Sequence, residues 1–228
     1  MMAMPLDNSE VFSTPDALAK AAAMLMLEKA EKAIETRGEF HCVLAGGTTP
    51  RMTYEYLSKA SSQWSEWHIY IGDERCLPVD DSERNSLMIE QSLLDHVAIP
   101  SKQYYPMPAE KGPELAADMY SKQMPERFDF VLLGMGEDGH TASLFPGHLH
   151  SSDKTVLPVY DSPKPPPERV SLSYAVLGDA LNTLILVSGA GKSEIVRRWQ
   201  QGEEFPVAKV AASSKAKVFL DQAAAAGL

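Results

Sequence analysis

A short glycine-rich segment near the middle of the chain brings an acid and an imidazole close together. The stretch FDFVLLGMGEDGHTASLFPG, residues 128–147, places Asp138 two residues before His140. A carboxylate at this spacing can orient an imidazole and stabilise its protonated form, as a general base requires. An exposed turn with an incidental histidine is the alternative, and this segment alone leaves both interpretations open.

The same segment matches G-x-G-x-x-G from Gly134 to Gly139, the spacing of dinucleotide-binding loops. A pyrophosphate site needs open N–H groups at a helix start and no competing negative charge. Here Glu137 and Asp138 occupy the turn, and Pro146 limits any helix that follows. We therefore interpret the glycines as a tight turn that presents the acid and the imidazole, and we expect no nucleotide cofactor.

Two other glycine-containing loops could bind an anion. Gly46-Gly47-Thr48-Thr49 joins a predicted strand to a predicted helix, where N–H groups, hydroxyls and the helix dipole would converge on an oxyanion. A capped helix start explains this loop equally well. The later G-A-G-K-S segment is not a nucleotide-binding P-loop, because Leu186 stands where that motif needs glycine. What remains there is Lys192 at a predicted helix start, a candidate contact for a single phosphate.

Other side chains give weaker signals. Arg75 and Arg169 lie near predicted strand or loop boundaries, where each could contact an anion or be a solvated surface charge. His148 and His150 form H-x-H without a further ligand at a convincing spacing, so we expect no metal site. The chain contains no G-x-S-x-G segment, so a serine hydrolase mechanism has no support.

The elements that would position these residues alternate between strand and helix. Thr14-Pro15 predicts a helix start and Gly38 its end. Further helices are expected from Pro50 to about residue 60, over 83–97 and 113–124, and after Lys192. Strands are expected in 40–47 and 181–189, each ending in a glycine turn, and over 67–74, 128–133 and 168–177. Extended segments are expected at 206–212 and 217–220, a surface loop at 162–169 and a last helical turn at 221–228. Such alternation predicts a mostly parallel sheet with helices on both faces, where ligands bind beyond the carboxyl ends of the strands.

Length and composition fit one soluble α/β domain over residues 1–228. The formal net charge of −10 argues against nucleic-acid and anionic-membrane partners. No signal peptide, no run long enough to span a membrane and no paired-cysteine motif is present, which favours a cytoplasmic protein.

Five segments together resemble the glucosamine-6-phosphate isomerase/6-phosphogluconolactonase family, from about Phe40 to Val210. They are LAGGTTPRMTYEYL, IYIGDERCLPVDDSERNSLMI, FDFVLLGMGEDGHTASLFPGH, SPKPPPERVSL and VSGAGKSEIV. The third and fourth are the most specific. Where the first loop of the family more often has serine, this chain has Thr48, which retains the hydroxyl.

The resemblance implies a Rossmann-like three-layer α/β/α fold without nucleotide, of the NagB/RpiA-like type. It also implies hydrolysis of 6-phosphogluconolactone to 6-phosphogluconate in the oxidative pentose phosphate pathway, without metal or cofactor, by a monomer or small homo-oligomer. His140 would be the base and Asp138 its orienting partner, and Asp73 and Arg75 would line the lactone, with Arg75 as our candidate for stabilising the oxyanion. The phosphate would be bound by Gly46, Gly47, Thr48, Thr49, Arg169 and Lys192.

Two alternatives remain. An amino-sugar-phosphate deaminase of the same superfamily would carry a glutamate downstream of the histidine, where this chain has Phe145. A non-catalytic sugar-phosphate sensor would normally be joined to a DNA-binding module, for which this acidic chain offers no room.

Overall fold

A computed structural model describes residues 6, 8–149, 151, 153–214 and 216–228. The main sheet has seven strands, all parallel to their neighbours. In spatial order they are β1 (Ser9–Phe12), β10 (Lys217–Asp221), β9 (Thr183–Val187), β6 (Phe130–Gly134), β2 (Phe40–Leu44), β3 (Trp67–Ile71) and β5 (Tyr104–Tyr105). The central strands are buried along nearly their whole length, as expected for a parallel sheet covered on both faces.

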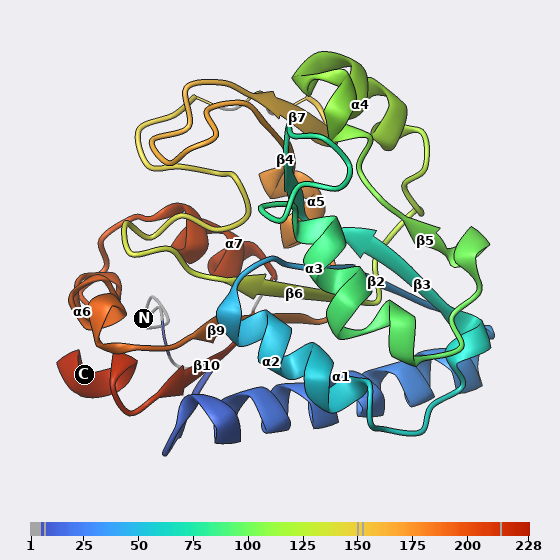
Figure 1. The fold of residues 1–228 in the computed structure, drawn as a ribbon. Helices are drawn as coiled ribbons and strands as arrows, with labels where there is room; N and C mark the ends of the chain where they lie inside the picture. Colours follow the sequence, from blue (N-terminus) through green and yellow to red (C-terminus); the bar gives the residue numbers. More distant parts are fainter. Residues whose placement is uncertain (1–5, 7, 150, 152, 215) are drawn as a thin grey trace.

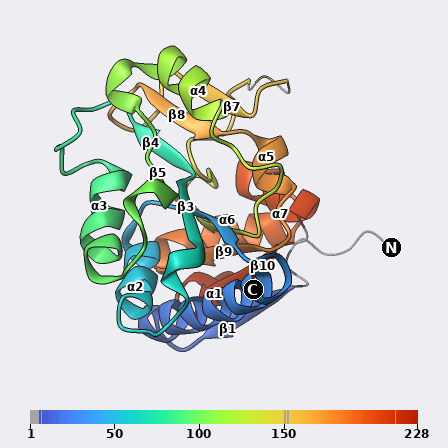
Figure 2. The same ribbon diagram turned by 90° about the vertical axis from the view of Figure 1, so that its right-hand side faces the viewer.

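Helices cover both faces of this sheet, which gives the expected three-layer arrangement. The α-helices are α1 (Pro15–Arg37), α2 (Thr48–Leu57), α3 (Asn85–Ser92), α4 (Pro113–Ser121), α5 (Tyr174–Gly178), α6 (Ser193–Gln200) and α7 (Pro206–Ser214). Short 3-10 helices occupy Trp64–Glu66, Leu94–His96, Ser101–Gln103, Ala109–Lys111, Ala190–Lys192 and Ala224–Gly227. Figures 1 and 2 show α1 and α2 on one side of the sheet and α5 and α7 on the other. Within the described residues, no helix combines the length and hydropathy that a membrane crossing requires.

Helix α1 shows how local signals set the element bounds. The Thr14 hydroxyl accepts a hydrogen bond from the Ala17 N–H at 3.1 Å, and Pro15 follows as the first helical residue. At the other end, Gly38 has φ 82°, a left-handed conformation that glycine adopts at no steric cost. Both predicted ends of this helix are therefore confirmed.

A second, antiparallel sheet was not predicted. It contains β4 (Asp73–Arg75), β8 (Arg169–Leu172) and β7 (Val156–Val159), and α4 packs against it. The strand expected over 67–74 is therefore two strands, because the chain changes sheets at Gly72. This residue donates to Leu44 of the large sheet, and its carbonyl accepts from Leu172 of the small one, both at 2.9 Å.

The extended segment expected over 206–212 is wrong: it lies in helix α7. Pro206 begins the helix, and Val207, Val210 and Ala211 are buried at helical spacing. The strand expected over 168–177 ends at Leu172, since the Ser173 hydroxyl caps α5 through the Val176 N–H at 3.4 Å. The segment 217–220 is a strand as predicted.

A buried ion pair fixes α3 against the small sheet. Glu74 is fully buried and accepts hydrogen bonds from the N–H groups of Asn85 and Ser86, at 2.8 Å each. Its carboxylate also lies 3.5 Å from Nε of Arg84, which is itself buried. Removing one member of such a pair leaves an uncompensated charge and unpaired helix N–H groups.

We expect Glu74→Ala to lower the free energy of unfolding by about 3–5 kcal/mol. Urea denaturation of the purified variant measures this. The matched control is Glu55→Ala, which removes an exposed ion pair with Arg51 on α2 and should change stability by less than about 1 kcal/mol. Equal effects of the two substitutions would show that the buried pair is not important for stability.

Candidate active site

The loops singled out in the sequence follow four strands that are neighbours in the sheet. Strands β9, β6, β2 and β3 are consecutive in the order of the sheet, and all run in the same direction. Their carboxyl ends therefore form one continuous edge. The segments that follow these strands at this edge are 188–192, 135–140, 45–49 and 72–75. Parallel α/β sheets bind ligands at such an edge.

Direct contacts connect these loops. The Asp73 carboxylate accepts a hydrogen bond from the Ser143 hydroxyl at 2.6 Å, which links the loops after β3 and β6. The Asn85 side chain donates to the Asp73 carbonyl at 2.7 Å, and Gly46 approaches Asn85 so closely that an added Cβ would lie 1.9 Å from its Oδ1. A Cβ at Gly191 would lie 3.1 Å from the Glu137 carboxylate, so the loops after β9 and β6 are also in contact.

Asp138 and His140 form a hydrogen-bonded pair. The Asp138 carboxylate contacts His140 Nδ1 and also accepts from the His140 backbone N–H at 3.2 Å. Burial acts to raise the pKa of Asp138, but the hydrogen bonds and positive charge offered by His140 outweigh it and hold that pKa well below its usual range. An ionised carboxylate keeps the proton of the neutral ring on Nδ1. The lone pair of His140 Nε2 then remains available, and no described residue forms a hydrogen bond with it.

Backbone geometry holds this pair in place. Gly139 has φ 81°, and its carbonyl accepts a hydrogen bond from Val207 of α7 at 3.1 Å. No α-helix follows β6 directly in the described chain, which supports the interpretation of the glycines as a turn and not as a dinucleotide loop. The ring of buried Phe145 packs against the imidazole, with its centroid 4.8 Å from that of His140.

The turn leaves no room for a side chain at Gly136. A Cβ there would lie 2.0 Å from both Cε1 and Nδ1 of His140 and 2.8 Å from Asp138 Oδ1. We expect Gly136→Ala to displace the ring from its partner and lower kcat at least about 100-fold, because His140 is our candidate general base. Steady-state kinetics measures this. The control is Gly134→Ala at the end of β6, where an added Cβ meets nothing within 4 Å.

The loop after β2 presents donors for an anion. Gly47 is the N-cap of α2, with φ 107° and no side-chain cap. The N–H groups of Thr48 and Thr49 are in the first helical turn and have no intrahelical acceptor, and Pro50 has no N–H. Thr48 is exposed and Thr49 half-buried, so a ligand can reach both. These donors and the positive end of the helix dipole suit a phosphate group.

Lys192 lies on the loop after β9, at the start of α6. Buried Asp221 shapes this loop by accepting hydrogen bonds from Gly189 N–H and the Ser188 hydroxyl, at distances from 2.7 to 3.1 Å. Burial lowers the pKa of Lys192 below its usual value of 10.5, while Glu137 and Asp138 act in the opposite direction. The ammonium group is thus an electrostatic neighbour of the Asp138–His140 pair.

The two arginines are cross-strand partners in the small sheet, Arg75 on β4 and Arg169 on β8. Arg169 is only 5% exposed; it donates to the carbonyls of Lys164, Pro165 and Pro166 at 3.0 to 3.2 Å and lies over the Phe145 ring. Arg169 therefore orders the proline-rich segment 164–166. Of its guanidinium nitrogens, only Nη1 has no hydrogen bond to a described residue. Arg75 donates through Nη1 to the Glu83 carbonyl, while its buried Nε has no partner in the described part of the chain.

Asp73 is buried at the junction of the loops. Its side chain is 6% exposed and is bonded to Ser143 and, at 3.4 Å, to Asn85. These contacts suit a residue that positions the loops, and its place against the lactone stays a prediction. Asn85, Ser143 and Phe145 were not predicted as members of the site. Asn85 and Ser143 stand out in the structure because they are polar and buried. The sequence alone does not reveal that burial.

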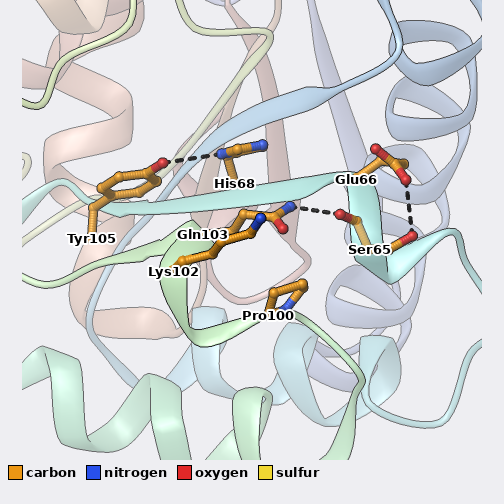
Figure 3. Close-up of a pocket in the computed structure, with 7 residues that line it drawn as sticks. All are labelled: Ser65, Glu66, His68, Pro100, Lys102, Gln103 and Tyr105. Carbon is orange, nitrogen blue, oxygen red and sulfur yellow. Dashed lines mark hydrogen bonds between the residues drawn. The ribbon is translucent and has the colours of Figure 1, made fainter.

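A separate hollow lies away from this edge. It has a volume of about 590 Å³ and is lined by residues 65, 66 and 68, around the amino end of β3, and by residues 100, 102, 103 and 105 (Figure 3). The histidine–carboxylate pair and the anion-donor loops follow the carboxyl ends of the strands, so this hollow is not part of the candidate active site. Of the H-x-H pair, His148 contacts the Phe145 ring, and His150 lies outside the described residues.

The fold and the site define an α/β protein with a histidine–carboxylate pair at the same sheet edge as two loops that offer donors to an anion. The chain belongs to the glucosamine-6-phosphate isomerases/6-phosphogluconolactonase family, whose model matches residues 13–220. Two similar proteins are the 6-phosphogluconolactonases of Rattus norvegicus and Mycobacterium tuberculosis. The first is 35% identical, over 94% of this chain and 91% of the relative, and the second 38% identical, over 82% and 83%.

Solved structures give the same picture. The 6-phosphogluconolactonase of Thermotoga maritima has a TM-score of 0.86 and 28% identity, covering 94% of this chain and 100% of that one. The enzyme of that name from Trypanosoma brucei has a TM-score of 0.86 and 29% identity, covering 97% and 98%. A monomeric glucosamine-6-phosphate deaminase of the NagB superfamily also aligns with a TM-score of 0.86, but at 20% identity this likeness concerns the fold alone.

Proposed function

We propose that this chain hydrolyses 6-phospho-D-glucono-1,5-lactone to 6-phospho-D-gluconate, with His140 as the general base. The reaction belongs to the oxidative pentose phosphate pathway. The observation that carries the mechanism is the Asp138–His140 pair. Nε2 of His140 has no partner among the described residues, and the pair lies at the same sheet edge as the Thr48 and Lys192 loops. The names and similarity of the relatives support the substrate.

The proposed reaction needs little beyond a base, a positioned carbonyl and a stabilised oxyanion, because a δ-lactone is an activated ester. Nε2 of His140 takes a proton from water as its oxygen attacks the lactone carbonyl carbon. The protonated ring then gives the proton to the leaving ring oxygen as the C–O bond breaks. Asp138 stabilises the charged ring. We assign oxyanion stabilisation to the guanidinium of Arg75, on β4 directly after β3.

Phosphate recognition is assigned to Gly46, Gly47, Thr48, Thr49, Arg169 and Lys192. The glycines allow close approach of the backbone, the threonines provide N–H and hydroxyl groups, and the two cations provide charge. Because the phosphate is remote from the reacting carbon, its binding energy serves to hold the ring against His140.

Burial of Lys192 makes phosphate binding sensitive to alkaline pH. The ammonium binds phosphate only while protonated, and its pKa is lower than the usual 10.5. Affinity for 6-phosphogluconate should therefore decline as pH rises through a range below 10.5, where an ordinary lysine is still charged. Product titrations by calorimetry between pH 7 and 10 measure this. Lys192→Arg should remove the decline, and an unchanged decline in that variant would show that another group causes it.

Amino-sugar-phosphate deamination is disfavoured by the residue that stands where the deaminases have a glutamate. Phe145 is buried against the His140 ring, so no carboxylate from this position can assist ring opening. The test is acid release from freshly prepared lactone, corrected for spontaneous hydrolysis, with ammonia release from glucosamine 6-phosphate measured in parallel. Ammonia without lactone turnover would reverse the assignment, and tight binding of 6-phosphogluconate without either reaction would indicate a sensor.

Several broader features are part of the same proposal. Residues 1–228 form one catalytic domain that acts as a monomer or small homo-oligomer in the cytoplasm, without nucleic-acid or membrane partners. The unpaired Cys42 and Cys76 suit a reducing compartment. The reaction needs no metal or cofactor, so treatment with a chelator should leave kcat unchanged.

A further inference from the structure

Three possible metal ligands meet at the amino ends of β2 and β3. His41 and His68 are paired in register on these neighbouring strands, and Glu39 immediately precedes β2. The group is distant from the proposed active site. From His41 to Gly46, five residues further along the chain, the extended backbone spans about 16 Å.

The carboxylate of Glu39 faces both imidazoles. One oxygen lies 3.1 Å from Nε2 of His41, and the other lies 3.8 Å from Nε2 of His68. One ligand atom from each residue can be chosen so that all three lie within 4.8 Å of one another. Zinc binds imidazole nitrogen and carboxylate oxygen at about 2.0–2.2 Å, so two ligands of one tetrahedral ion are about 3.3–3.5 Å apart. The two distances from the Glu39 carboxylate to the imidazoles are 3.1 Å, just below that range, and 3.8 Å, just above it.

The histidine rings need one adjustment to share an ion. Their planes are nearly parallel, at 13°, with centroids 4.4 Å apart, so one ring must tilt to direct its lone pair at the same point as the other. His68 has space to tilt because it borders the open hollow of about 590 Å³ (Figure 3). The same hollow gives a water molecule access as a further ligand.

The surroundings of the group also suit a metal site. Tyr105 hydroxyl lies 3.2 Å from Nδ1 of His68, and Figure 3 shows this contact at one side of the hollow. A partner on the far nitrogen is what orients a metal-binding imidazole and fixes its tautomer. The Tyr105 ring is itself held by stacking on Tyr70, with centroids 4.3 Å apart. Nδ1 of His41 is buried without a partner among the described residues, so Glu39 at Nε2 is the ring's polar contact.

We propose that Glu39, His41 and His68 bind one divalent transition-metal ion of the Zn²⁺ type, with water completing the coordination. Two imidazoles and one carboxylate are donors that suit Zn²⁺, Ni²⁺ and Cu²⁺. The bound ion would tie the turn before β2 to the amino ends of β2 and β3. Because it is remote from the loops at the carboxyl edge, its effect would be on the stability of the sheet and not on lactone hydrolysis.

The test uses the untagged chain, stripped with a chelator and titrated with Co²⁺, whose visible absorption reports low-coordinate imidazole ligation, and with Zn²⁺ by calorimetry. We expect one ion per chain and an increase in melting temperature on Zn²⁺ addition. Glu39→Gln and His68→Gln should each weaken Zn²⁺ binding at least about 100-fold and abolish the visible band. Tyr105→Phe, which keeps the stacked ring, should weaken binding about 10-fold.

The matched control is His96→Gln, which removes an exposed histidine bonded to the Gln91 carbonyl and should change nothing. Folding of each variant is checked by circular dichroism and by lactonase activity, which should be that of the parent chain with and without Zn²⁺. Glu39 is half-exposed, so its substitution leaves the fold intact even if a histidine variant does not. Absence of one-to-one binding, or binding that survives both Glu39→Gln and His68→Gln, would overturn the proposal.

Discussion

Substitution of His140 by alanine is expected to lower kcat for lactone hydrolysis about 10²- to 10⁴-fold, the usual contribution of a general base. The affinity for 6-phosphogluconate should change little, since the proposed phosphate donors belong to the loops after β2 and β9 and to Arg169. The described contacts of the His140 side chain are to Asp138 and Phe145, neither of which is a proposed phosphate donor. Initial rates and product titration on the same preparation measure both quantities.

Two further variants make this result specific. His96→Ala removes an exposed histidine that is bonded to the Gln91 carbonyl, and it should leave kcat unchanged. Asp138→Asn keeps the ring but removes the charge that stabilises its protonated form, so kcat should fall by less than in His140→Ala. Unchanged turnover in His140→Ala, after subtraction of spontaneous hydrolysis, would remove this residue from the mechanism.

Substitution of Lys192 by alanine is expected to weaken phosphate recognition more than it slows the chemical step. A charge-assisted hydrogen bond contributes about 1.5–3 kcal/mol, which corresponds to a loss of about 10- to 150-fold in affinity for 6-phosphogluconate. Lys192 is half-buried at the start of α6, and no described residue forms an ion pair or hydrogen bond with its ammonium group. Product Kd and KM for the lactone should rise together, with a smaller change in kcat.

The comparison with gluconate, which lacks the phosphate, shows whether the loss concerns this group. The parent chain should prefer 6-phosphogluconate strongly, and Lys192→Ala should lose most of that preference. The control Lys122→Ala removes an exposed lysine paired with Asp118 on the surface and should bind as the parent does. If affinities for phosphorylated and unphosphorylated ligands fell equally in Lys192→Ala, the assignment of Lys192 to the phosphate would be wrong.

Features set by local chemistry were predictable from the sequence. Thr14, Pro15 and Gly38 bound α1 as expected, because caps and φ preferences act within a few residues. The buried strands β2, β6 and β9 followed from short apolar runs. Parallel alternation then placed the glycine loops at one edge, and the sheet order confirms that they follow neighbouring strands.

Features set by distant partners were not predictable. The small sheet depends on pairing of Asp73–Arg75 with Arg169–Leu172, almost a hundred residues later, and no local pattern encodes that register. The buried position of Asp73 follows from the same pairing. Segment 206–212 was misassigned because its valines suggest a strand, while burial against the rest of the fold selects the helix.

The account depends most on a phosphate pocket and the His140 ring sharing one ligand. A crystal structure of the chain with bound 6-phosphogluconate tests this directly. We predict phosphate oxygens within about 3 Å of the Thr48 N–H and the Lys192 ammonium, and the C1 carboxylate within hydrogen-bond reach of His140 Nε2. A product whose phosphate lies elsewhere, or whose C1 lies a sugar's length from His140, would contradict both the site and the mechanism.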